Sequence, residues 1–189
     1  MINIIKFNYL KLKIMSKKNL VLIIAIITLA AASRLVRHPA NFTPIAAMAM
    51  FGGWYFTKKY YVIIPLIAML VSDAFIGFYD WRLMTFVYIG IALTFIIGWV
   101  LKKNPSWHKV AIGSLTGSII FFLITNFAVW SLYSWYPHTG AGLLNCFAMA
   151  LPFFKNSLAG DLFYSVALFG VYELVWYYAS VKQTKLMKI

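Results

Sequence analysis

The chain has 189 residues, of which 63% are hydrophobic and only 11% are charged. This composition excludes an ordinary soluble domain, and it predicts an all-α protein, a polytopic membrane helical bundle. Lys and Arg number 17 against four Asp and Glu, a formal net charge of +13. These bases lie in short clusters between apolar runs, which is typical of membrane topology and argues against nucleic-acid binding. The single cysteine, Cys146, excludes an internal disulfide and leaves packing or a lone ligand as its role.

The N-terminal residues 1–18 contain five lysines and no acid. They are predicted to form a basic cytoplasmic tail that contacts anionic lipid, and Met15 is an alternative start of translation. The apolar residues 19–33 are predicted as the first span. Lys17 and Lys18 before this segment and the alanines 30–32 inside it also fit a signal peptide, so cleavage remains an alternative.

The second predicted span, residues 45–57, is unusually short. Thr43 followed by Pro44 is a typical helix start, with a capping hydroxyl and then a proline where no amide donor is needed. The segment would rise only about 20 Å, less than the ~30 Å hydrocarbon core. It also contains Gly52 and Gly53. Short spans interrupted by glycine often flank binding sites in transporters, while a locally thinned membrane is the alternative explanation.

Four longer apolar runs follow, and they are predicted to span the membrane at residues 60–78, 83–101, 110–135 and 157–181. Gly113 and Gly117 form a G-x-x-x-G pattern, which predicts close helix packing. A further apolar piece, at about residues 143–154, is predicted as a short outer-side helix or re-entrant segment.

Charge counting supports this topology. If residues 143–154 do not cross, 13 of the 17 basic residues fall on one side. The positive-inside rule then places both termini in the cytoplasm, with six spans. We therefore predict a single membrane domain at residues 19–181, followed by a second basic cytoplasmic tail at residues 182–189.

Polar and aromatic residues that this topology places in the outer half of the protein form the candidate site. A polar side chain at membrane depth is costly unless it finds a partner, so such residues indicate a buried network or a binding site. We predict an outward-opening pocket in which a few fixed polar groups and aromatic walls hold a small molecule. The candidate substrate-binding residues are Arg34, Asn41, Asp73, Asn126, Trp130, His138 and Asp161.

Each candidate also has a structural interpretation. Asp73 could form an ion pair with Arg34 or Arg37, and Asp161 could complement the dipole of its own helix in the first turn. Trp130 and the neighbouring aromatic residues could form an interfacial belt. The formal charges around the mouth sum to +1, which does not select a cationic or an anionic ligand. A small planar or zwitterionic molecule, such as a vitamin or its precursor, fits the aromatic content best.

Missing motifs narrow the function. The chain has no G-x-x-x-x-G-K-[ST], no H-E-x-x-H and no G-x-S-x-G. We therefore expect no catalytic site, cofactor or metal, and nucleotide hydrolysis would have to come from another chain. Glu173, in the inner half of the last span, is an isolated acid that could contact a partner, Lys182 or a proton path.

Four segments resemble a known group of proteins: HPANFTPIAAMAMFGGWYF, LIAMLVSDAFIGFYDW, FFLITNFAVWSLYSWYPHTGAGL and PFFKNSLAGDLFY. They resemble a family of small, uncharacterised bacterial membrane proteins that look like the substrate-binding S components of energy-coupling-factor (ECF) transporters. The resemblance covers residues 19–180. It implies a six-helix vitamin or micronutrient binder in the bacterial inner membrane, working with a coupling subunit and two ATPases. The A-x-x-x-A docking pattern of many S components is not kept, since Ala25 is followed four residues later by Leu29.

The sequence thus predicts a small-molecule-binding component of membrane transport, with a substrate, lipid and other transporter subunits as partners. The alternative from another class is a structural or accessory membrane protein whose polar residues only connect helices. An intramembrane enzyme is a third alternative.

Overall fold

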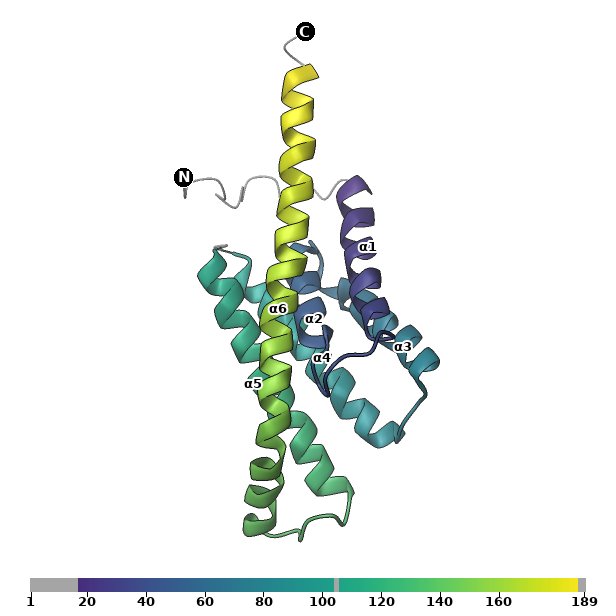
Figure 1. Ribbon diagram of the computed structural model, residues 1–189, viewed down its shortest axis with the longest axis vertical. Coiled ribbons are helices and arrows are strands. Elements are labelled where there is room, and N and C mark those ends of the chain that lie inside the picture. Colours follow the sequence, from purple (N-terminus) through teal and green to yellow (C-terminus); the bar gives the residue numbers. More distant parts are fainter. Residues whose placement is uncertain (1–16, 104–105, 187–189) are drawn as a thin grey trace.

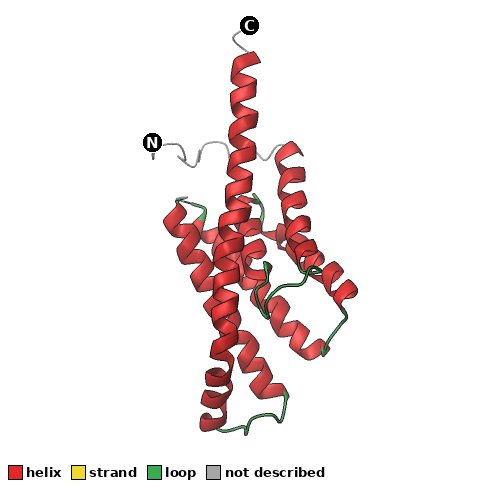
Figure 2. Ribbon diagram, in the orientation of Figure 1, coloured by secondary structure: helices red, strands yellow, loops and turns green. Residues whose placement is uncertain are grey.

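The computed structural model describes residues 17–103 and 106–186. In this part of the chain all regular structure is helical and no strand is present (Figures 1 and 2). The elements are α1 (Lys17–Ser33), α2 (Ile45–Tyr55), the short 3-10 helix η2 (Lys59–Val62), α3 (Ile63–Ile76), α4 (Trp81–Leu101), α5 (Trp107–Leu132) and α6 (Gly140–Leu186). The all-α prediction is confirmed for these residues. Most of the predicted tail 1–18 lies outside them, whereas residues 182–186 of the second tail continue α6.

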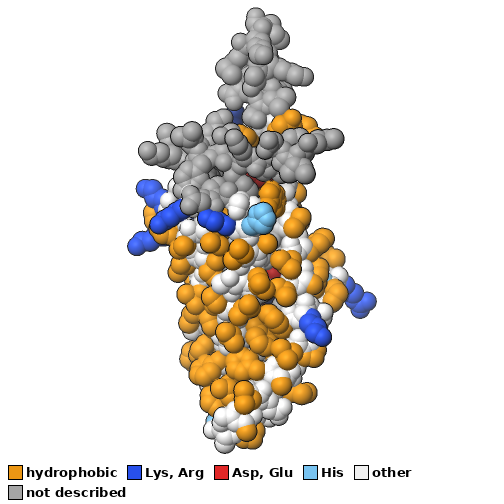
Figure 3. Space-filling model, turned by 90° about the vertical axis from the view of Figure 1, so that its left-hand side faces the viewer, with side chains coloured by type: hydrophobic (Ala, Val, Ile, Leu, Met, Phe, Trp, Pro, Cys, Tyr) orange, Lys and Arg blue, Asp and Glu red, His pale blue; other side chains and the backbone are white. Residues whose placement is uncertain are grey.

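Four stretches of the described chain are long and apolar enough to cross a membrane: Lys59–Ile76, Trp81–Leu101, Trp107–Leu132 and Gly140–Ala179. Large hydrophobic side chains on these helices face outward; Phe75, for example, is 75% exposed and Val166 is 63% exposed. Hydrophobic side chains are spread over the part of this face that is not drawn in grey in Figure 3, and few charged side chains lie among them. The chain is thus a membrane-embedded helical bundle, while the count of six crossings stays a prediction.

The helices alternate in direction along the long axis of the molecule (Figure 1). The start of α1, the end of α6 and the connections α2–α3 and α4–α5 lie toward one end, and the connections α3–α4 and α5–α6 lie toward the other. Lys58, Lys59, Lys102 and Lys103 all belong to the first group. This arrangement agrees with the two-sided distribution of charge in the sequence.

Helix α2 is the centre of the bundle, and all its residues except Ile45 are buried. A helix that is apolar on every face has to be enclosed by other helices. It lies so close to α4 that a Cβ on Gly53 would collide with the backbone carbonyl of Phe95, and one on Gly98 with that of Met50. Glycine at these two positions therefore sets the distance between the two helices.

The start of α2 differs from the sequence prediction. Pro44 is the N-cap residue, and it makes no side-chain capping hydrogen bond, so the prediction that Thr43 caps this helix is wrong. Because the first amides of a helix have no partner within it, another group has to face them. That group comes from α6 and lies in the candidate site.

Helix α6 runs without interruption for 47 residues, or about 70 Å at 1.5 Å per residue. The prediction of a separate outer-side helix or re-entrant segment at residues 143–154 is therefore wrong, because these residues form early turns of α6. The helix continues through Pro152. The polar residues after Pro152 do not interrupt the helix: Lys155 is exposed, and the hydroxyl of Ser157 donates to the carbonyl of Phe153 at 3.2 Å.

The G-x-x-x-G prediction is confirmed. A Cβ on Gly113 would lie 2.7 Å from a methyl group of Leu101, and one on Gly117 would lie 2.8 Å from a methyl group of Thr94. Both neighbours belong to α4, so the small residues allow α4 and α5 to approach closely.

Candidate functional site

A pocket of about 370 Å³ lies among α4, α5, α6 and the loops that follow α1 and α3. Its volume is in the range of small-molecule sites. Its polar lining consists of Arg34, Asn41, Thr43, Tyr79, Ser118, Thr125, Asn126, Ser157 and Asp161. Ile45 of α2 and Met69 of α3 also line this cavity. Every helix from α2 to α6 and two loops therefore contribute to it, far more than a contact between two helices requires.

Arg34, directly after α1, forms a buried ion pair with Asp73 of α3. Its Nη2 lies 2.8 Å from Asp73 Oδ1, and the two side chains are 9% and 2% exposed. Its Nη1 donates to the hydroxyl of Ser72 and lies 2.9 Å from the sulfur of Met69. The second carboxylate oxygen of Asp73 accepts a 3.0 Å hydrogen bond from the hydroxyl of Tyr88. The interpretation that Asp73 pairs with Arg34 is therefore confirmed, and both charges are compensated.

Asp161 of α6 is the second buried carboxylate, with only 5% of the residue exposed. The hydroxyl of Ser118 donates to it at 2.6 Å. The backbone N–H groups of Ala46 and Ala47, in the first turn of α2, also donate to it. Asp161 thus complements the positive end of α2. The interpretation that it complements its own helix is wrong, since α6 begins at Gly140.

Asn126 of α5 and Asn41 of the loop after α1 both bring amide groups to the pocket. The Nδ2 group of Asn126 donates to the backbone carbonyl of Phe122 at 2.8 Å. Asn41 has a positive φ of 62°, a conformation that asparagine tolerates better than most residues. The loop around it is fixed to α6 by Asn156, whose Nδ2 donates to the carbonyl of Ala40 at 3.1 Å.

Phenylalanine rings form much of the apolar wall. Phe121 and Phe122 come from α5, and Phe153 and Phe154 come from α6. The rings of Phe122 and Phe154 are 4.6 Å apart between centroids. This wall is suited to a flat apolar or aromatic body.

Trp130 and His138 do not line the pocket. Their rings pack edge to face, 5.5 Å apart, near the connection between α5 and α6. The indole N–H of Trp130 donates to the carbonyl of Pro137 at 3.0 Å, and a ring nitrogen of His138 lies 3.3 Å from the carbonyl of Tyr133. The two residues hold this turn together.

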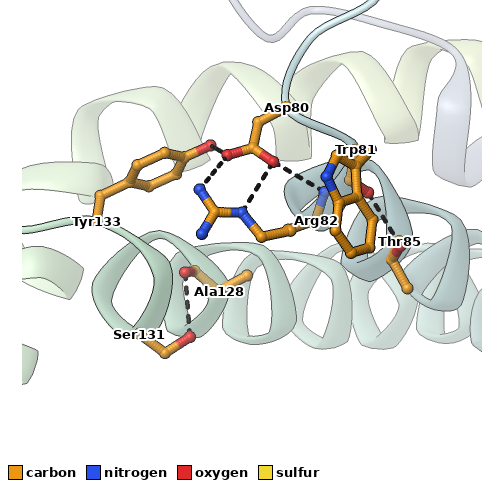
Figure 4. Close-up of polar contacts among 7 residues, drawn as sticks. All are labelled: Asp80, Trp81, Arg82, Thr85, Ala128, Ser131 and Tyr133. Atoms are coloured by element: carbon orange, nitrogen blue, oxygen red, sulfur yellow. Dashed lines mark hydrogen bonds and ion pairs between the residues drawn. The ribbon is translucent and has the colours of Figure 1, made fainter.

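The loop between α3 and α4 is tied to the end of α5 beside the pocket (Figure 4). Asp80 caps α4 and accepts hydrogen bonds from the backbone and the guanidinium of Arg82. The hydroxyl of Tyr133, which follows α5, donates to the same carboxylate at 3.0 Å. Hydrogen bonds from the Arg82 side chain and then from its backbone hold the pKa of Asp80 well below its usual value.

Tyr79, in the same loop, contributes its side chain to the pocket. Burial, and then the negative charge of Asp73, raise the pKa of Tyr79 to about 12. Its hydroxyl therefore stays protonated at neutral pH and can donate or accept a hydrogen bond.

Cys146 and Glu173 have partners away from the pocket. Cys146 is 2% exposed, and its thiol lies 3.5 Å from the backbone carbonyl of Asn126. This favours packing over a role as a lone ligand. Glu173 accepts a 2.7 Å hydrogen bond from the hydroxyl of Tyr55, a contact within the bundle that the sequence did not predict.

Of the predicted site residues, Arg34, Asn41, Asn126 and Asp161 line the pocket, and Asp73 lies behind Arg34. Tyr79, Ser118 and the phenylalanine wall also line the pocket and are not among the predicted residues. For Ser118 a signal existed, because it directly follows the second glycine of the G-x-x-x-G pattern. The phenylalanines gave no such signal, since single apolar residues in a membrane helix do not show which way they face.

Comparison with known proteins identifies the family of the chain but no function. No curated protein and no solved structure matches the chain. One family matches residues 14–184, nearly the whole sequence, and it is described as a family of unknown function. The chain belongs to this family, DUF6580.

Proposed function

We propose that the protein is the small-molecule-binding component of a membrane transport system. The observation that carries the proposal is the pocket of about 370 Å³, which a buried carboxylate, a buried guanidinium and two amide side chains all line. Protein interiors are close-packed, and polar groups at membrane depth are costly. A cavity of this size and lining is therefore best explained by a ligand that fills it.

The resemblance to ECF-type S components extends the proposal. In that arrangement the chain captures a vitamin-like or micronutrient-like molecule from the outer side of the bacterial inner membrane. ATPases from other chains hydrolyse ATP to drive transport, and a coupling subunit connects them to this chain. This is consistent with the lack of a P-loop motif in this sequence. The chain would cross the membrane six times, with both termini in the cytoplasm.

One observation favours the alternative of a structural or accessory membrane protein. The ion pair between Arg34 and Asp73 is complete within the protein, so these two residues need no ligand to explain them. The alternative does not explain why the cavity beside this pair stays open.

Copurification tests the proposal. The full chain, purified gently from its native membrane, should release a small molecule that mass spectrometry of the denatured sample detects. Replacing Ala150, which lines the pocket, by Trp should remove that molecule. Ala148→Trp is the matched control, because Ala148 lies on the same helix but is exposed and outside the pocket. Identical small-molecule spectra from the two variants would contradict the proposal.

Cysteine labelling tests the proposed orientation. In a Cys146→Ser background, His138→Cys should react with an impermeant maleimide on intact cells. Lys103→Cys should react only after permeabilisation. Labelling of position 103 on intact cells would reverse the assignment of the two sides.

A further inference from the structure

The pocket contains one formal charge that the protein does not balance with an opposite charge. Among the described residues, the ion pairs are Arg34 with Asp73 and Arg82 with Asp80. Asp161 takes part in neither. Its donors are a hydroxyl and two backbone amides, which are dipoles and carry no net charge.

The guanidinium of Arg34 already has an anionic partner, although its buried Nε–H has no hydrogen-bond acceptor among the described residues. Its two terminal nitrogens already contact Asp73, Ser72 and Met69. The charges of Arg34 and Asp73 cancel, so the carboxylate of Asp161 is the one formal charge of the described lining that has no opposite charge beside it. An anionic ligand would face this carboxylate in a setting of low dielectric, where like charges repel strongly.

The remainder of the lining favours the same sign of charge. The faces of the four phenylalanine rings from α5 and α6 carry negative electrostatic potential, which attracts a cation near a ring. The free lone pairs of the amide oxygen of Asn126 and of the hydroxyl of Thr43 are acceptors for an N–H donor.

A bare metal ion does not fit the pocket. No group of three or more His, Cys, Asp or Glu side chains that could hold a metal is found in the part of the chain that the structure describes. The cavity volume of about 370 Å³ also matches an organic molecule far better than an ion.

We propose that the pocket binds a small organic cation, with a protonated amine or ring nitrogen near Asp161 and an apolar or aromatic body between the phenylalanine rings. This rests on the proposed function, namely that the pocket is a ligand site, and it adds the chemical class of the ligand. Molecules of the same shape that carry a carboxylate or phosphate are excluded.

Two probes with the same ring and opposite charge test the class. Tryptamine and indole-3-propionate share an indole and a two-carbon chain, and they differ in the charge at its end. In calorimetric titrations of the full chain in detergent, tryptamine should bind roughly 10- to 100-fold more tightly, as expected for a hydrogen bond to a charged group. Asp161→Asn should remove this preference.

A second variant covers the case in which Asp161→Asn fails to fold. Asn126→Asp adds a carboxylate to the pocket at nearly constant volume and should increase the preference for tryptamine. Asn145→Asp is its control, since Asn145 lies on α6 but is exposed and outside the pocket, and it should leave the preference unchanged.

Equal or tighter binding of indole-3-propionate would overturn the inference, and so would a preference that survives in folded Asp161→Asn. Failure of tryptamine to bind at millimolar concentration would also overturn it. These results are separable from failure of the proposed function. If indole-3-propionate binds and Ala150→Trp blocks this binding, the pocket is a ligand site, but for organic anions and not for cations.

Discussion

Two cavities of similar size differ in what surrounds them. The pocket among α4, α5 and α6 has a volume of about 370 Å³, and a groove between α1 and α3 has about 430 Å³. The groove is lined by aliphatic and aromatic carbon, with Thr28 and Ser72 as its polar residues. The pocket adds buried charge and amide groups. The two volumes therefore do not show which cavity binds a ligand. The lining does, because buried polar and charged groups that face an empty or apolar space are unfavourable.

In the groove, lipid is a sufficient occupant. Its residues Val71 and Phe75 are 52% and 75% exposed, as expected for a surface in contact with acyl chains. Acyl chains in the other pocket would leave Asp161 and Asn126 facing hydrocarbon, which is unfavourable for polar groups. The polar pocket therefore requires water or a ligand with polar groups.

The linings of the two cavities are in contact near the end of α1. Ser72 lines the groove, while Arg34 and Met69 line the pocket. The hydrogen bond from Arg34 to Ser72 and the ion pair to Asp73 therefore form the wall that keeps an apolar space apart from a polar one.

Breaking this wall should have the largest effect. Arg34→Ala leaves Asp73 buried without a counter-charge, which should lower the free energy of unfolding by about 3–5 kcal/mol. Denaturation in mild detergent measures it. Arg37→Ala, in the same loop but exposed, is the control and should change stability by about 0.5 kcal/mol or less. Similar losses in both variants would mean that the wall does not depend on the ion pair.

The next largest effect concerns the scaffold on which the polar pocket depends. Gly53→Ala forces α2 away from the carbonyl of Phe95, and overpacking of this kind should cost about 1–3 kcal/mol. Gly170→Ala is the matched control, because a Cβ there meets nothing within 4 Å. It should be neutral or stabilising by up to about 1 kcal/mol, since alanine favours the helix. If Gly53→Ala melted at the wild-type temperature, the close contact between α2 and α4 would be refuted.

Part of this architecture could be predicted from the sequence. Long apolar runs and clustered lysines predict helices and their alternation, because hydrophobicity and charge act on each segment by itself. The continuity of α6 through Pro152 could not be predicted in this way. Contacts with distant parts of the chain, such as the hydrogen bond from Asn156 to the carbonyl of Ala40, are not visible in the sequence of this segment.

The candidate site also has features that the sequence predicts and features that depend on tertiary packing. The pairing of Asp73 with Arg34 could be predicted, because a buried charge in a membrane needs a counter-charge. The prediction that Trp130 and His138 belong to the site rests on their membrane depth. Depth gives only the position along the membrane normal. The position within the membrane plane depends on helix packing, which places these residues near the connection between α5 and α6. For the same reason, the position of Asp161 at the start of α2 cannot be predicted from the sequence.

A matched pair of substitutions tests the comparison between the cavities directly. Ala68→Leu adds three carbons to the groove, and Ala150→Leu adds the same three to the polar pocket. We expect Ala150→Leu to reduce the amount of copurified small molecule. Ala68→Leu should leave that amount unchanged and alter stability by about 0.5 kcal/mol or less, because it only displaces lipid. Loss of the molecule in Ala68→Leu alone would identify the groove as the binding site.

The smallest expected effect concerns the exposed edge of the polar pocket, where Asp80 joins Arg82 and Tyr133. The folded protein lowers the pKa of Asp80, so the ionised carboxylate stabilises the folded state. This contribution is fully present above the pKa of an unfolded aspartate, about 3.9, and is lost as the pH falls through the folded-state value. The melting temperature of the wild type should therefore exceed that of Asp80→Asn slightly at pH 7. The difference should shrink below about pH 4, because the unfolded chain then binds the proton more readily than the folded one. A difference that grew on acidification would show that the carboxylate is strained in the folded state, and the tie between the two loops would then not stabilise the mouth of the pocket.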